Sequence, residues 1–230
     1  MKHLTTGAFV LVFLISSPYL FAQGVLKGRI LFKGVPPAAE QVEVKSDTPV
    51  CGQKKEVKKL ILGTEQGVAN AVITLSGAGG VPAGPKEGML DQVHCEFVPH
   101  VQVLPVGAAL KLTSSDVVLH NAHGFYEDGS TAFNLAVPIV GMEVSQKLKQ
   151  AGVIKLRCDA GHTWMSAYIV VTEKPYYALT DANGHFTLEG IPPGTYEMEV
   201  WHEWLGKHRE SLTIKEGEQT VSVTLEPPPV

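Results

Sequence analysis

Short runs of alternating apolar and polar residues recur along most of this chain, and turn residues separate them at short intervals. In one such run, Val153 to Cys158, alternation places Ile154, Leu156 and Cys158 on one face of a strand. The 23 Gly and 15 Pro among 230 residues suit a turn-rich β protein better than a helical one. No long helical pattern competes, although Lys54 to Leu62 is compatible with a short helix. The pattern predicts an all-β protein built from β-sandwiches rather than βαβ units.

The first 22 residues have the pattern of an export signal. A cationic start, Met1-Lys2-His3, precedes an apolar run over residues 8–15, and Leu20-Phe21-Ala22 leads to Gln23. This order predicts a Sec signal peptide cut between Ala22 and Gln23, because the apolar run is too short to cross a bilayer. The alternative is an uncleaved N-terminal anchor. We expect a periplasmic or secreted protein with no membrane span after signal removal, since no other window approaches about 18 apolar residues.

Charge and motifs exclude several function classes. A formal net charge of −4 argues against nucleic acid as the main partner. Gly-x-Ser-x-Gly, P-loop and dinucleotide-binding fingerprints are absent from the sequence. His202-Glu203 with His208 lacks the spacing of a zinc protease helix. These observations predict a binding or carrier protein rather than an enzyme.

The segment Cys158-Asp159-Ala160-Gly161-His162-Thr163-Trp164-Met165 carries most of the chemical information. A loop this short brings a thiolate, an imidazole and a thioether to one end of a sandwich. His120, at the end of an upstream apolar run, completes a His₂Cys set if its strand neighbours the Cys158 strand. His123 is the rival, but residues 120 and 123 point to opposite faces of a strand. A His₂Cys site with a distant Met is the ligand set of mononuclear blue copper.

This cluster resembles the cupredoxins of the plastocyanin and amicyanin type. Phe97-Val98-Pro99, Val106-Gly107, Ser114-Ser115-Asp116, His120-Asn121 and the Cys158 loop follow the order of that family. The resemblance implies a Greek-key sandwich, single-electron transfer, and copper held by His120, Cys158, His162 and an axial Met165. Asn121 would tie the two ligand loops together. The spacing from Cys158 to His162 is three intervening residues, which lies between the two and four residues of the family's Cys-x₂-His-x₂-Met and Cys-x₄-His loops.

One departure from a related site sets the expected number of ions. The Cys158 loop also resembles half of the binuclear copper loop of cytochrome oxidase subunit II. That site needs a second Cys at the position occupied here by Ile154. The sequence therefore predicts a single copper ion.

Three further side chains have open interpretations. Trp164 is either a partner-docking surface beside His162 or a lid over the core. Cys51 and Cys95 are the two cysteines left after Cys158 is assigned to metal. In an oxidising compartment they suggest a disulfide. A redox pair, or extra metal ligands with His94 and His100, are the alternatives.

The flanks have a different character. Thr180-Asp181-Ala182-Asn183-Gly184-His185-Phe186 and Gly190-Ile191-Pro192-Pro193-Gly194 resemble the carboxypeptidase regulatory-like domain, a small transthyretin-like sandwich. Gly28 to Gly34 and Gly67 to Val72 resemble its opening strands. We expect residues 24–80 and 173–228 to form one sandwich that carries the copper domain as an insertion.

We expect the chain to consist of a signal peptide (1–22), an N-terminal β segment (23–84), the cupredoxin domain (85–172) and the C-terminal sandwich (173–230). This combination resembles the cupredoxin-containing methylamine-utilization-type proteins. The leading hypothesis is a blue-copper electron carrier between redox partners such as a cytochrome or a dehydrogenase. The alternatives are a protein that binds or delivers copper without electron transfer, and a non-metal sandwich module that binds carbohydrate or protein.

Overall fold

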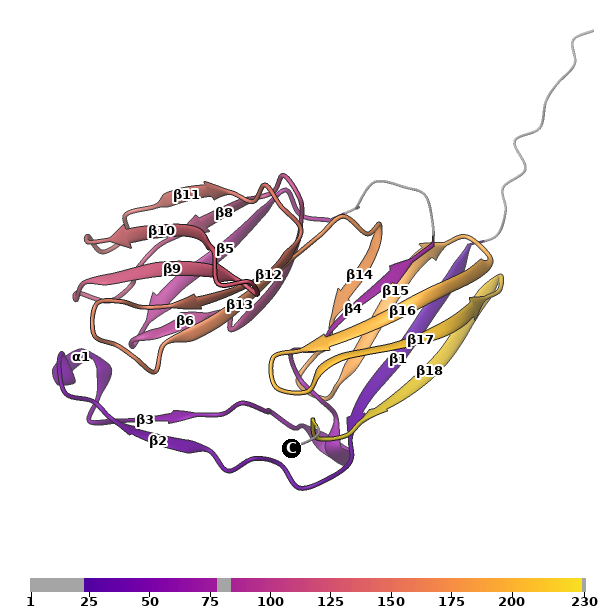
Figure 1. The fold of residues 1–230 in the computed structure, drawn as a ribbon, viewed down its shortest axis with the longest axis horizontal. Coiled ribbons are helices and arrows are strands. Elements are labelled where there is room, and N and C mark those ends of the chain that lie inside the picture. Colours follow the sequence, from indigo (N-terminus) through magenta and orange to yellow (C-terminus); the bar gives the residue numbers. More distant parts are fainter. Residues whose placement is uncertain (1–22, 78–83, 229–230) are drawn as a thin grey trace, which may run out of the picture.

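The computed structural model describes residues 23–77 and 84–228, and their regular secondary structure is almost wholly β-strand. The predicted all-β sandwich fold is confirmed. The predicted signal peptide lies outside the described residues. Within those residues, no helix is both long and apolar enough to cross a membrane. Two sandwiches lie side by side and are joined below by a narrow arm (Figure 1).

The central sandwich consists of two sheets over a common core. One sheet has the strand order β10-β9-β12-β13-β7 and the other has β11-β8-β5-β6. The strands are β5 Glu87–Val93, β6 Glu96–Val98, β7 Val101–Pro105, β8 Ala109–Leu112, β9 His120–Tyr126, β10 Thr131–Val137, β11 Val144–Lys147, β12 Gly152–Arg157 and β13 Ser166–Thr172. Ile154 and Leu156 of β12 are buried in this core together with Cys158, as their alternation predicted.

The flanking sandwich takes strands from both ends of the chain. Its sheets have the orders β15-β1-β18 and β14-β4-β16-β17. The strands are β1 Gly24–Phe32, β4 Val72–Ser76, β14 Tyr176–Leu179, β15 His185–Ile191, β16 Gly194–His202, β17 Gly206–Ile214 and β18 Gly217–Leu225. Strand β1 pairs with β15 and β18, and β4 pairs with β14 and β16. The central sandwich is thus an insertion between β4 and β14, which is the arrangement expected from the resemblance of the flanks.

A small apolar cluster joins the two sandwiches. Val72 and Trp201 come from the flanking sandwich, and Val101, Val153 and Val170 come from the central one. All five side chains are buried. Because apolar area removed from water stabilises association, this cluster fixes one sandwich against the other.

The arm is the hairpin formed by residues 40–57. It contains β2 (Glu40–Glu43), the helix α1 (Thr48–Cys51) and β3 (Lys54–Val57), and the 3₁₀ turn η1 (Thr64–Gln66) follows it. Strands β2 and β3 pair only with each other among the described residues. The short helix expected over Lys54 to Leu62 is wrong, because the first four of these residues pair with β2 as a strand.

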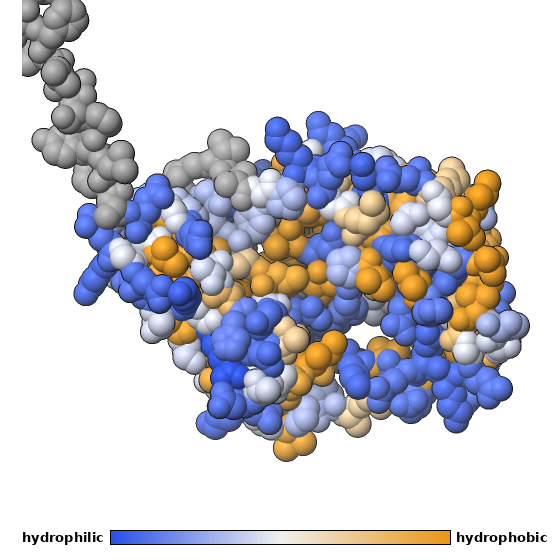
Figure 2. Space-filling view, turned by 180° about the vertical axis from the view of Figure 1, so that it is seen from behind, coloured by the Kyte–Doolittle hydropathy of each residue, from blue (hydrophilic) through white to orange (hydrophobic). Residues whose placement is uncertain are grey.

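The arm leaves the flanking sandwich and ends against the central one (Figure 1). A hollow of about 530 Å³ separates its inner side from the two sandwiches, with Val57, Met165 and Trp204 among its lining residues. Figure 2 shows this hollow from behind the molecule. The arm therefore bridges the sandwiches and closes over one end of the central core.

Candidate metal centre

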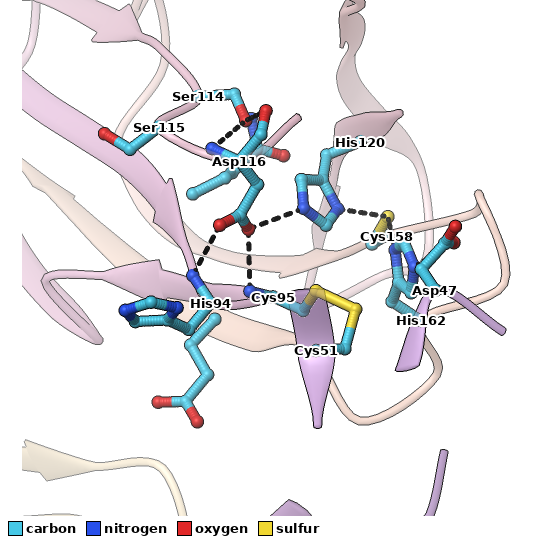
Figure 3. Close-up of polar contacts among 12 residues, drawn as sticks. Asp47, Cys51, His94, Cys95, Ser114, Ser115, Asp116, His120, Cys158 and His162 are labelled. Carbon is cyan, nitrogen blue, oxygen red and sulfur yellow. Dashed lines mark hydrogen bonds and ion pairs between the residues drawn. A yellow bond between two sulfur atoms is a disulfide. The ribbon is translucent and has the colours of Figure 1, made fainter. Parts of the chain in front are cut away.

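Three predicted ligands meet at the end of the central sandwich. His120 begins β9, Cys158 follows β12, and His162 lies in the loop between β12 and β13. The Sγ of Cys158 is 3.9 Å from Nδ1 of His120 and 3.7 Å from Nδ1 of His162 (Figure 3). Both imidazoles are fully buried and the cysteine is nearly so. The strands thus deliver two imidazole nitrogens and one sulfur to a single point in the core.

The spacing of these donors fits one transition-metal ion. In zinc proteins a metal lies about 2.3 Å from sulfur and about 2.0–2.1 Å from nitrogen. Ligands at those distances, separated by roughly 120° at the ion, are about 3.7–3.8 Å apart. The two sulfur–nitrogen distances of 3.7 and 3.9 Å match this value. The two sulfur–nitrogen distances therefore suit a trigonal His₂Cys set, and all three donor atoms lie within 4.8 Å of one another.

A carboxylate binds the far nitrogen of each histidine. Nε2 of His120 is 2.9 Å from Oδ2 of Asp116, and Nε2 of His162 is 3.0 Å from Oδ2 of Asp47. A neutral imidazole has one N–H and one lone pair, and an ionised carboxylate only accepts hydrogen bonds. In a neutral imidazole bonded in this way, Nε2 carries the hydrogen and Nδ1 keeps the lone pair, and here both Nδ1 atoms face Cys158. Such carboxylate partners fix the tautomer and orientation of metal-binding histidines.

Asp116 binds the backbone of a turn as well as the side chain of His120. Its two carboxylate oxygens also accept the backbone N–H groups of His94 and Cys95, each at 2.7 Å. Burial opposes ionisation of Asp116, but the hydrogen bonds from Cys95, His120 and His94 outweigh it and lower its pKa. Burial also lowers the pKa of His120, despite the opposing effect of Asp116. The pair is therefore an ionised carboxylate beside a neutral imidazole, which is the form that binds metal.

Asn121 and His123 take the positions expected from strand alternation. The side-chain oxygen of Asn121 accepts the backbone N–H of Asp159 at 2.6 Å, which ties β9 to the loop after Cys158. His123 lies on the other face of β9, where its Nδ1 contacts a carboxylate oxygen of Asp159 at 2.6 Å. His120 is therefore the histidine of this strand that reaches Cys158.

Met165 closes the ligand loop. Its backbone N–H donates to the carbonyl of His162 at 3.0 Å, and its side chain is buried in the same core cluster as Cys158. Its assignment as the axial group stays a prediction from the resemblance.

Trp164 lies in the core and not on an open surface. It is only 8% exposed, and its Nε1–H donates to the carbonyl of Cys95 at 2.9 Å. The centroid of its ring lies 5.4 Å from the centroid of the His162 ring. The expected docking edge at His162 and Trp164 is therefore corrected, because both rings are buried. The alternative, a lid over the core, agrees with this placement.

The two remaining cysteines are joined in a disulfide, Cys51–Cys95. Cys51 ends α1 of the arm, and Cys95 lies in the turn between β5 and β6. The bond therefore anchors the tip of the arm to the central sandwich. It also fixes the segment that carries Asp47.

Sequence reasoning missed the two carboxylates. Asp116 precedes His120 by four residues, and this short spacing was a usable local signal. Asp47 lies 115 residues before His162, so only the folded arm brings them together.

An exposed apolar patch adjoins His120. Its members lie in the loop before β9 and in the loop after β10, and they are Val117, Leu119, Ile139, Val140 and Met142. The two loops are linked by a hydrogen bond from the Gly141 N–H to the Ser114 carbonyl at 2.9 Å. Leu119 directly precedes the buried His120. One end of the exposed apolar patch is therefore a single residue away from His120 along the chain.

A family model described as polysaccharide lyase family 4, domain II, matches residues 148–222. This range begins in the central sandwich and runs through most of the flanking one. The matching family is thus not the carboxypeptidase regulatory-like domain that the flank resembles. A comparison with curated proteins gives no match.

Several solved structures are similar to part of the chain. A purple cupredoxin from Nitrosopumilus maritimus has 21% identity and a TM-score of 0.32, over 36% of this chain and 98% of that one. A copper-containing nitrite reductase from Thermus scotoductus SA-01 has 22% identity and a TM-score of 0.33, over 42% of this chain and 24% of that one. A Cu(I) amicyanin mutant has 16% identity and a TM-score of 0.33, over 44% of this chain and 98% of that one. The chemistry of the centre therefore rests on its own residues.

Proposed function

We propose that this protein is an exported mononuclear blue copper protein that carries single electrons between redox proteins and catalyses no reaction itself. The convergence of the His120 and His162 Nδ1 atoms on Cys158 Sγ, at 3.9 and 3.7 Å, carries the proposal. One thiolate with two imidazoles and a weak thioether is the donor set of such centres.

His120, Cys158 and His162 would hold the ion, with Met165 as the axial group. Copper bound there would supply one-electron exchange between Cu(I) and Cu(II). The thiolate and thioether favour Cu(I), whereas imidazoles also suit Cu(II). Because the three donors are buried, the site would need little rearrangement when a bound ion gains or loses an electron. Asp47 and Asp116 maintain that geometry through the two Nε2 atoms.

The partner, such as a cytochrome or a dehydrogenase, would dock on the exposed apolar patch around Leu119. Two observations support this position. The arm contacts His162 through Asp47, and the exposed Leu119 directly precedes the buried His120. Electron-transfer encounters are small and weak, so a patch of a few apolar side chains suffices.

The test is the visible spectrum of residues 23–230 with one equivalent of Cu(II), before and after ascorbate. We expect an intense band that bleaches on reduction and returns with oxidant. Cys158→Ser should abolish the band with the fold intact, whereas His123→Gln, on the opposite face of β9, should keep it. A colourless wild-type protein would overturn the proposal, and so would a Cys158→Ser variant that keeps the band.

Electron transfer is separated from copper delivery by the fate of the ion. A carrier is reduced by a cytochrome and reoxidised with its copper retained. A delivery protein loses copper to an apo acceptor under the same conditions. Loss of copper during turnover would therefore contradict the carrier role.

A further inference from the structure

All three cysteines of the chain meet at the metal centre. The Sγ atoms of Cys51 and Cys95 and one ring nitrogen of His162 lie within 4.8 Å of one another. Cys95 Sγ also lies within 4.8 Å of a ring nitrogen of His120 and a carboxylate oxygen of Asp116. Cys51, Cys95, His120, His162 and Asp116 are all buried, whereas the nearby Asp47 is partly exposed. The disulfide therefore borders both histidines of the centre, as Figure 3 shows.

The backbone holds Cys95 at this point under strain. His94 and Cys95 form the two-residue turn between β5 and β6, with φ angles of 51° and 59°. Turns with positive φ at both central positions normally take Asn and Gly, because other side chains are strained there. Asp116 accepts both backbone N–H groups of this turn, and Trp164 donates to the Cys95 carbonyl. The same carboxylate that orients His120 thus also positions the Cys95 sulfur.

Anchoring the arm does not require this placement, since a disulfide elsewhere along the hairpin would also fix it. We propose that Cys51 and Cys95 form a second metal site, closed as a disulfide and opened by reduction, which takes one Cu(I) ion between its two sulfurs beside His162. Thiolates select Cu(I) over harder ions. The proposal uses neither Cys158 nor His120 as a ligand, so it goes beyond the proposed carrier function.

Opening requires a two-electron reductant, and a dithiol is the chemical class that fits. Its two sulfurs become a disulfide while the Cys51–Cys95 bond breaks, and its two protons pass to the freed sulfurs. Binding of Cu(I) then releases both protons to solvent, because the thiolate is the ligand form. Atoms and electrons balance without any further reactant.

The arm gives the reductant a way in. Helix α1 has only four residues, and isolated helices of that length are unstable. Beside the disulfide, the tip is held by the Asp47–His162 contact, by Lys55, whose Nζ lies 3.0 Å from Glu96 Oε1, and by Val44 and Val50, which pack on the central core. A short segment at the edge of a core opens locally more easily than the paired strands do. Local opening of α1 would expose the Cys51 sulfur to attack.

The experiment counts Cu(I) ions bound by the mature chain, residues 23–230. Protein is used as isolated or after anaerobic treatment with dithiothreitol and desalting, and thiol counts verify reduction. Cu(I) is then titrated against bathocuproine disulfonate. We expect one ion in the oxidised protein and two in the reduced protein. The matched control, Cys51→Ser with Cys95→Ser, should bind one ion under both conditions.

A second variant keeps the test independent of the control's folding. Cys158→Ser lacks the first site but retains the Cys51–Cys95 pair, so it should bind no ion when oxidised and one when reduced. One ion in both states of the wild type, or none in reduced Cys158→Ser, overturns the second site. No ion in the oxidised wild type but one in the reduced protein overturns the proposed carrier instead and supports the dithiol site.

Discussion

Removing the charge of the carboxylates behind the two histidines should weaken copper binding to different degrees. Loss of such a partner typically lowers metal affinity about 10–100-fold. The Asp47 side chain is 39% exposed, so water screens its hydrogen bond to His162. Asp47→Asn should therefore lie at the lower end, at about tenfold or about 1.4 kcal/mol.

Asp116→Asn should have the larger effect. Asp116 accepts three hydrogen bonds, from His120, His94 and Cys95, while its side chain is only 4% exposed. An amide has one acceptor oxygen, and its NH₂ group would face a buried donor. We expect a loss near the upper end, about 100-fold.

Competition titration with a Cu(II) chelator at one pH and one salt concentration measures both effects. Asp128→Asn is the control, because its carboxylate accepts only from Ser130 on the surface. An Asp47→Asn affinity within about twofold of wild type, or a larger loss at Asp47 than at Asp116, would refute the reasoning about the carboxylates.

Four other outcomes are expected. Burial lowers the pKa of His202 from 6.5 to about 4, so between those pH values the unfolded chain binds a proton that the folded chain does not. The free energy of unfolding should then fall by up to about 3 kcal/mol as the pH falls through this window, and urea titrations of His202→Asn should show a flatter dependence. Cys51 and Cys95 are 44 residues apart, so replacing both with Ser should lower the free energy of unfolding in denaturant by about 4 kcal/mol, and a loss under about 1 kcal/mol would contradict this. Asn121→Ala leaves the Asp159 N–H without its acceptor, and we expect about 1 kcal/mol less stability and faster hydrogen exchange at that amide, with unchanged exchange counting against the tie. Leu119→Asp should slow electron self-exchange, measured by NMR line broadening, by about tenfold or more with an unchanged visible spectrum, since like charges would oppose each other across the contact; an unchanged rate would move docking away from the patch.

Local pattern was sufficient for the strands and for the ligand loop. Alternation around Ile154 and Leu156 identified a buried face, and the same face leads to Cys158. His120 was distinguished from His123 by strand geometry alone. These features depend on neighbouring residues, so a single sequence carries them.

Long-range features were not readable in the same way. Asp47 reaches His162 only because a hairpin from the flanking sandwich crosses to the central one. Trp164, whose exposure the sequence left open, is buried between the Cys95 turn and the His162 ring. In Lys54–Val57 a weak helical pattern gives way to pairing with β2. Strand pairing overrides a weak local preference in the last case, and in the first two the contact joins residues far apart in the sequence.

The nested order of the strands has a consequence for how the chain folds. Strand β1 pairs in parallel with β18, so that Gly24 lies opposite Gly217 and Phe32 opposite Leu225. The first strand to be synthesised therefore waits for the last, with unpaired edges and Leu26 and Ile30 uncovered. Pairing over such sequence separation is slow, and the exposed intermediate is prone to aggregate. The central sandwich has all its strands between residues 87 and 172, so it can form earlier and serve as a template that holds the two halves of its neighbour close together.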